Sequence, residues 1–137
     1  MTTQIELTDN ELLEQIENCS LNPELFTHET LLRLTWILIR KYGLNIAILK
    51  NNEIKGNYYK NALKNDKFNI TLTKAYTEIL HHFMQQTSTN NFDKLLREFP
   101  RLKYSFQDLV KTHYGYNILK EHRKEGPEQK KPFLFTF

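Results

Sequence analysis

The sequence predicts an all-α protein with a single helical bundle, and three observations lead to this prediction. Apolar residues recur at helical spacing in several segments, and polar residues that begin or end helices flank these segments. Strand-like alternation occurs only near the end of the chain, so a sheet has almost nowhere to form. With 137 residues and 39% hydrophobic content, the chain matches one ordinary domain. We expect a bundle over residues 1–126, with about four longer and two or three short helices, and an extended tail over residues 127–137.

The first helix is expected to begin near residue 9. Thr8 and Glu11 have the spacing of a capping box, in which a hydroxyl and a carboxylate satisfy amides of the first turn. The apolar stripe that follows is formed by Leu12, Leu13, Ile16 and Cys19. Asn22 and Pro23 then interrupt the helical pattern. Cys19 is the only cysteine, which excludes an internal disulfide, and we interpret it as a small core residue at the end of this helix.

The second helix is predicted to be the central one. Thr27 can cap its start, Lys41 lies in its expected last turn, and Gly43 follows as a typical helix stop. Its apolar residues are Leu31, Leu32, Leu34, Trp36, Ile37, Leu38, Ile39 and Tyr42. They cover nearly the whole circumference, which is typical of a helix surrounded by others.

The remaining helices are less uniform. Asn45 opens a third one, with Gly56 as a kink candidate and with apolar positions Ile46, Ala47, Leu49, Ile54, Tyr58 and Leu63. Asn69 can cap a fourth, whose buried face is formed by Leu72, Tyr76, Ile79, Leu80 and Phe83. A short helix is expected from Asn91 to Pro100, another turn or two over residues 105–110, and a last helix over residues 116–125.

Charge is distributed unevenly along the chain. Residues 1–32 carry seven acidic residues and no Lys or Arg, whereas the segment from Arg33 to Lys67 is mainly basic. The simplest interpretation is that an acidic first helix lies across a basic second or third one. The alternative is nucleic-acid binding through residues 33–67 and 120–131. A net charge of only +3 and the lack of a known binding fingerprint argue against it.

Signals of several other protein classes are missing from the sequence. No segment approaches the roughly 18 apolar residues of a membrane-spanning helix, and the start is polar and acidic, unlike a signal peptide. We therefore expect a cytoplasmic protein. No glycine-rich phosphate loop and no recognisable Ser or Cys nucleophile is present, so we assign no catalytic residue and no cofactor.

Metal binding has partial support. Ligands on one helix face stand three or four residues apart, and among the five histidines only His81 and His82 meet this condition, each with Glu78. Two ligands do not close a site. Glu78, His82 and His28 are therefore kept as weak candidates, and no metal is assigned.

The second and fourth helices also carry candidate ligand-binding residues. His28 and Glu29 lie in a first helical turn, where free amides favour a small anion or a polar ligand. The simpler interpretation is that Glu29 complements the helix dipole and His28 bonds a neighbouring loop. Trp36 and Tyr76 lie on the two buried helices and are the expected wall of a pocket, although an aromatic stripe is more often plain core.

Three segments give the chain a resemblance to a known family. Phe26 to Trp36 is similar to the motif FxHxxHLRxAW, and Lys67 to Thr73 is similar to the motif KYHETxT. The stretch from His113 to Pro132 is similar to a YY-containing C-terminal segment. Together these segments resemble a family of small bacterial all-helical proteins of uncharacterised function.

The resemblance implies a polar site at the starts of two helices, which is only partly kept here. Leu31 and Asn69 stand where the family pattern has histidines, Ile70 stands where it has a glutamate, and His28 is retained. The other retained residues are Arg33, Trp36, Thr71 and Thr73. Asn69 and Thr71 therefore join the candidate ligand-binding residues. A His and Glu cluster would suit a metal or acid–base site, so its loss argues against an enzyme.

We therefore expect a non-catalytic protein that binds a partner or a small ligand. A protein partner, or a second copy in a homodimer, would be bound through Phe133, Phe135 and Phe137 of the tail, because exposed apolar segments usually mark association sites. One alternative is a divergent metal-dependent enzyme with its site at the starts of the second and fourth helices. The other is a weak nucleic-acid binder.

Overall fold

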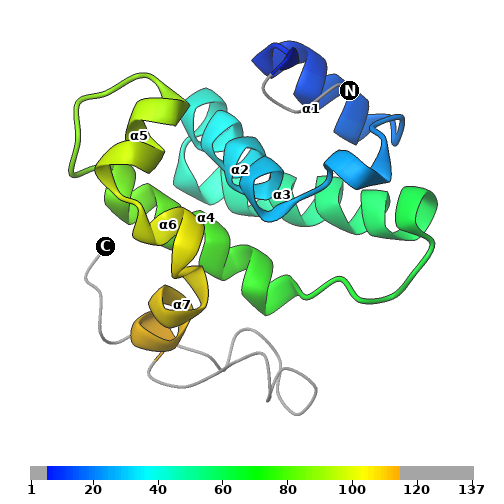
Figure 1. The fold of residues 1–137 in the computed structure, drawn as a ribbon. Helices are drawn as coiled ribbons and strands as arrows, with labels where there is room; N and C mark the ends of the chain where they lie inside the picture. The colour runs from blue at the N-terminus through cyan, green and yellow to red at the C-terminus, as the bar shows by residue number, and fades with distance from the viewer. Residues whose placement is uncertain (1–5, 115–137) are drawn as a thin grey trace. The chain divides into compact units, whose positions relative to one another are not determined.

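The computed structural model describes residues 6–114, and within this range the chain forms helices joined by short turns and loops, with no strand. The chain divides into two compact units, with the boundary between Phe68 and Asn69 (Figure 1). The predicted all-α helical-bundle class is confirmed. The predicted helix over residues 116–125 and the tail with Phe133, Phe135 and Phe137 lie outside the described residues. No helix within residues 6–114 is long and apolar enough to span a membrane.

In the first unit, α1 spans Asp9–Glu17 and begins at the predicted capping box. The Oγ1 atom of Thr8 accepts a hydrogen bond from the Glu11 amide at 3.1 Å, and Oε1 of Glu11 accepts one from the Thr8 amide at 2.9 Å. The helix stops at Glu17, and Cys19 lies beyond it with a positive φ of 63°. Cys19 is only half-buried. The interpretation of Cys19 as a core residue of the first helix is therefore wrong, because the chain reverses before reaching it.

A 3-10 turn, Pro23–Leu25, leads to α2, which spans His28–Tyr42. Thr27 caps α2 as predicted, since its hydroxyl accepts a hydrogen bond from the Thr30 amide at 3.3 Å. Gly43, with a φ of 82°, ends the helix in a conformation that favours glycine. Residues 32–39 are all buried, which confirms the prediction of a helix enclosed around its circumference.

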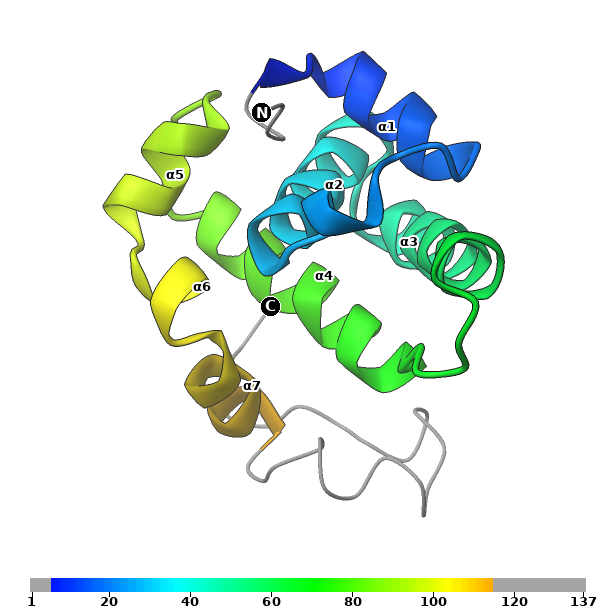
Figure 2. The same cartoon turned by 45° about the vertical axis from the view of Figure 1, so that its right-hand side comes forward.

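The third helix, α3, spans Leu44–Tyr58 and continues into one π-helical turn over Tyr59–Leu63. α1 packs against both α2 and α3, and α2 packs against α3 (Figure 2). Arg33 of α2, only 9% exposed, forms an ion pair of 2.8 Å with Asp9 of α1. The acidic first helix therefore lies across the two basic ones, as the charge distribution indicated.

The buried face of α3 differs from the one that its apolar residues suggest. Ile46 and Leu49 are 49% and 68% exposed. The buried residues are Ala47, Asn51, Ile54, Lys55 and Tyr58. Their spacing of i, i+4, i+7, i+8 and i+11 is that of one helix face. The apolar pattern misleads because two polar residues, Asn51 and Lys55, belong to this buried face while apolar residues point outward.

In the second unit, α4 spans Ile70–Met84, and Asn69 caps it by accepting a hydrogen bond from the Leu72 amide at 2.9 Å. The helices that follow are α5 (Phe92–Glu98), α6 (Arg101–Tyr104) and α7 (Phe106–Tyr114). α7 packs against α4 and is longer than the predicted residues 105–110. Pro100 follows α5 as predicted but also precedes a helical turn, α6, that was not predicted. Its φ of −59° is already suited to a helix start.

Candidate functional site

The predicted ligand-binding residues of the first unit all lie on α2. His28 and Glu29 are half-buried in its first turn. Trp36 is 5% exposed, and the guanidinium of Arg40 lies 4.7 Å from the centre of its ring. Such a cation–π contact covers one face of the ring. Trp36 therefore acts as a core residue whose outer face is shielded by a cation.

The predicted ligand-binding residues of the second unit lie on α4. The Asn69 side chain is engaged as the cap of the helix. Thr71 is 3% exposed, and Tyr76 stacks on Phe106 with ring centres 4.3 Å apart. His28, Glu29 and Trp36 belong to the first unit, whereas Asn69, Thr71 and Tyr76 belong to the second. The predicted ligand-binding residues are therefore divided between two units, and each group is considered within its own unit. Within its own unit, each of Asn69 and Tyr76 has a clear structural role.

The weak metal candidates Glu78 and His82 lie near the end of α4. The Nε2 atom of His82 is 2.8 Å from the side-chain nitrogen of Gln86, and its ring packs edge-on against Phe83. Burial, and secondly the charge of His82, lowers the pKa of His81. In the part of the chain that the structure describes, no three His, Cys, Asp or Glu side chains gather as a metal ion would require.

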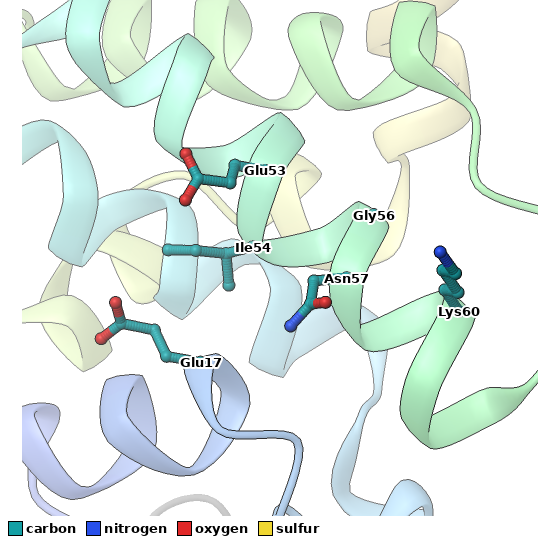
Figure 3. A pocket seen from close by; sticks show the side chains of 6 residues that line it. All are labelled: Glu17, Glu53, Ile54, Gly56, Asn57 and Lys60. Carbon is teal, nitrogen blue, oxygen red and sulfur yellow. The ribbon is translucent and has the colours of Figure 1, made fainter.

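A groove of the first unit lies between the end of α1 and the C-terminal part of α3 with the π-helical turn that follows it (Figure 3). Its volume is about 560 Å³, and it is lined by Glu17, Glu53, Ile54, Gly56, Asn57 and Lys60. Clefts of roughly 300–1,000 Å³ are the usual size of small-molecule sites. None of the six lining residues was predicted as a site residue. The groove is therefore a new candidate site.

The charged side chains are separated along this groove. Glu17 and Glu53 lie at one end on either side of Ile54, and Lys60 lies at the other end (Figure 3). Ile54 is only 6% exposed and contributes an apolar floor, whereas the three charged residues are exposed. The groove thus offers two carboxylates, one ammonium and an apolar surface to the same ligand.

Hydrogen bonds hold the two walls of the groove together. Nδ2 of Asn57 donates to Sγ of Cys19 at 3.4 Å, and that Sγ lies 3.8 Å from the Asn57 carbonyl oxygen. The Tyr58 hydroxyl donates to the Leu21 carbonyl oxygen at 2.7 Å. Asn61 donates to Oδ1 of Asn57 at 2.6 Å. The bonds of Cys19 and Leu21 join the turn after α1 to the end of α3 and so fix the separation of the walls, whereas the Asn61 bond lies within one wall and orients the Asn57 amide.

Tyr58, the residue after Asn57 in α3, is fully buried. Its ring centre is 4.2 Å from that of Phe26. Burial, and secondly the charge of Cys19, raises the pKa of the Tyr58 phenol. The phenol therefore stays protonated and remains a hydrogen-bond donor well into the alkaline range. Tyr58 is thus a permanent link between α3 and the segment that follows α1.

A second group of buried polar side chains lies where α2 packs on α3. Nδ2 of Asn51 donates to Oγ1 of Thr35 at 2.9 Å, and this hydroxyl donates to the Leu31 carbonyl oxygen at 2.8 Å. Lys55, one turn after Asn51, is 2% exposed, and burial lowers its pKa from 10.5 to about 7. Perturbed lysines are common at functional sites, but here the side chain is closed off from solvent.

An exposed apolar patch lies where α2 ends and α3 begins. We define this corner patch by Tyr42, Ile46 and Leu49, which are 38%, 49% and 68% exposed. The ammonium groups of Lys41 and Lys50 lie 5.7 Å and 5.6 Å from the centre of the Tyr42 ring. The corner patch therefore combines apolar side chains with two cations.

Comparisons with family models, with curated proteins and with solved structures find no match to this chain. The resemblance to the bacterial family therefore stays a prediction based on its motifs. A local signal for the groove does exist in the sequence. Glu53, Asn57 and Lys60 stand at i, i+4 and i+7, which places three polar groups on one face of a helix.

Proposed function

We propose that this chain is a non-catalytic protein that binds a small polar molecule in the groove between α1 and α3. The observation that carries the proposal is the presence of opposite charges at the two ends of one groove with an apolar floor between them. Small-molecule sites typically combine apolar surface with a few polar groups that fix the orientation of the ligand. Walls already held in place reduce the entropy that binding would cost.

The family resemblance supports a non-catalytic role. Leu31 and Ile70 are apolar where the family pattern has His and Glu, and Asn69 is engaged in capping α4. A metal-dependent or acid–base site at the starts of α2 and α4 would lack those groups. We therefore place the divergent enzyme below the binding protein.

Nucleic-acid binding ranks lower still. In the basic segment over residues 33–67, Arg33 pairs with Asp9 and Lys55 is buried. Phosphate binding requires cations that face solvent together, and these two do not.

Fragment binding tests the groove directly. We expect a library of small amines, carboxylates and zwitterions, screened by ¹⁵N NMR, to contain ligands that shift the backbone amides of Glu17 and of residues 53–60. The double variant Glu53→Gln with Lys60→Gln should weaken these ligands by roughly tenfold, because it removes one charge from each end.

The matched control is the double variant Glu14→Gln with Lys64→Gln, which removes the same two charges from exposed positions outside the groove. It should bind the fragments as the wild type does. A screen in which no fragment shifts these amides, or in which both double variants lose binding equally, would contradict the proposal.

A second candidate function is binding of a protein partner, and the corner patch favours it. Contiguous exposed apolar side chains often mark an association surface. Lys41 and Lys50 would favour a partner segment that carries carboxylates beside its apolar residues, because complementary charge selects the partner and speeds encounter.

Two matched helical peptides test this second candidate. Both carry leucines on one face, and their remaining positions are glutamate in one peptide and lysine in the other. We expect the acidic peptide to bind, with an affinity that falls as salt is added, and the basic peptide not to bind. Leu49→Ser should weaken the acidic peptide roughly tenfold, while the free energy of unfolding changes by only about 0.5 kcal/mol because this side chain is exposed. Equal binding of both peptides would contradict an acidic partner.

A further inference from the structure

The charged side chains at the two ends of the groove are too far apart for one small ion to contact both. Glu53 and Lys60 are seven residues apart, which corresponds to two helical turns and a separation of about 10 Å along the axis on the same face. Glu17 approaches Glu53 from α1, so the two carboxylates come from different elements and face the same end. A ligand that contacts both ends must be extended.

The sign of the charges selects between classes of extended ligand. A cation at the Glu17 end is attracted by two carboxylates, whereas an anion there is repelled by both. At the other end, Lys60 attracts an anion and repels a cation. A dicarboxylate is therefore disfavoured at one end and a diamine at the other. The arrangement fits a zwitterion whose ammonium and carboxylate are well separated.

Asn57, between the two ends, can recognise a peptide group. Its Oδ1 accepts one hydrogen bond, from Asn61, and its Nδ2 donates one, to Cys19. A side-chain amide can accept two and donate two, so one acceptor and one donor position remain. A peptide group presents the complementary N–H and C=O. Asn57 is exposed, and its existing bonds hold the amide in a fixed orientation.

On the basis of the proposed function, we infer that the groove binds short peptides by their two free termini. The ammonium of the peptide lies between Glu17 and Glu53, the carboxylate lies at Lys60, and Asn57 contacts a peptide group between them. A residue of extended chain spans at most about 3.5 Å, so two or three residues bridge the groove. A single α-amino acid, with both charges on one carbon, does not reach both ends.

Trialanine and its blocked forms test this assignment. We expect trialanine to bind with shifts of the groove amides in ¹⁵N NMR. N-acetylation and C-terminal amidation should each weaken it by about twofold to fivefold, because each removes one partly exposed ion pair. Free alanine should bind more weakly than trialanine by a comparable factor.

Charge-removing variants locate each terminus. Lys60→Met should remove the difference between trialanine and its amide while N-acetylation still weakens binding. Glu53→Gln should reduce the difference between trialanine and its N-acetyl form. Lys64→Met, outside the groove, should behave as the wild type. Thermal unfolding of each variant is the check that these exposed substitutions leave the fold intact.

The outcomes separate this inference from the proposed function. If blocked and free trialanine bind equally, or if alanine binds as tightly as trialanine, the peptide assignment is overturned. If library fragments occupy the groove but trialanine does not, the peptide assignment fails and the proposed function stands. If neither the fragments nor trialanine shifts the groove amides, both are overturned.

Discussion

Replacement of Lys55 by methionine is expected to abolish a steep dependence of stability on pH. Lys55 is 2% exposed, and burial lowers its pKa from 10.5 to about 7. Once the Lys55 amine is protonated in the folded state, the free energy of unfolding is lower by about 5 kcal/mol, as an order of magnitude, than it would be with a neutral lysine. Methionine has a similar length and no charge, so the variant does not carry this penalty.

The direction of the effect follows from proton binding. Between about pH 7 and the ordinary lysine pKa, the unfolded chain binds a proton at Lys55 and the folded protein does not. The free energy of unfolding therefore rises with pH in this interval, by up to about 1.4 kcal/mol per pH unit. Below about pH 7 both states are protonated, so the slope vanishes while the penalty remains. Tyr58 and Tyr59, whose pKa values are raised by burial, add an opposite slope only near and above their ordinary value of 10.0.

Urea unfolding between about pH 7.5 and 9 measures this slope without the tyrosines. The wild type should gain about 2 kcal/mol across this range. Lys55→Met should show a nearly flat profile and exceed the wild type by roughly 4 kcal/mol at the lower pH and by about 2 kcal/mol at the higher one. Lys50→Met, a half-buried lysine on the same helix, is the control and should keep the wild-type slope. A Lys55→Met profile as steep as that of the wild type would show that Lys55 is not the titrating group.

The starts of α1, α2, α4 and α5 were predictable because the chemistry that sets them is local, whereas α3 begins at Leu44, after Gly43 and without a side-chain cap, and not at the predicted Asn45. Thr8, Thr27, Asn69 and Asn91 each accept a hydrogen bond from an amide three residues later. Both partners of such a bond can be seen in a short stretch of sequence. The same reasoning failed for Cys19, since the reversal after Glu17 is closed by turn hydrogen bonds that have no strong residue signature.

The groove and the polar side of α3 were not predictable for two different reasons. The helical pattern identifies a buried face only when that face is apolar, and Asn51 and Lys55 break this assumption. The groove depends on tertiary contacts, because Cys19 and Asn57 are 38 residues apart. Spacing places Glu53 and Lys60 on one face but does not reveal that Glu17 lies opposite.

Replacement of Tyr58 by alanine is expected to lower the free energy of unfolding by about 3–5 kcal/mol, the range for truncating a large buried aromatic side chain. Tyr58 is fully buried, its ring packs at a tilt against that of Phe26, and its hydroxyl donates a hydrogen bond to the Leu21 carbonyl oxygen. Tyr58→Phe keeps the ring and removes only the hydroxyl. It should cost about 1–3 kcal/mol, because the buried carbonyl oxygen loses its donor.

Tyr59→Phe is the matched control, since Tyr59 is the adjacent residue, is half-buried and also packs against Phe26. Its cost should be about 0.5 kcal/mol or less. Urea unfolding of Tyr58→Ala, Tyr58→Phe and Tyr59→Phe gives the three stabilities, and a loss in Tyr58→Phe no greater than in the control would show that the Leu21 bond contributes little.

The same variants report on the groove, because the Tyr58 bond is one of the links between its walls. Tyr58→Phe should weaken trialanine severalfold although the hydroxyl lines no part of the groove, since the ligand must then restore the separation of the walls. Unchanged affinity in a variant that is measurably less stable would instead assign the positioning of the walls to Cys19 and Asn57 alone. In that case Cys19→Ala, which removes the sulfur bonded to Asn57 and changes no residue that lines the groove, is the substitution that should lower the affinity.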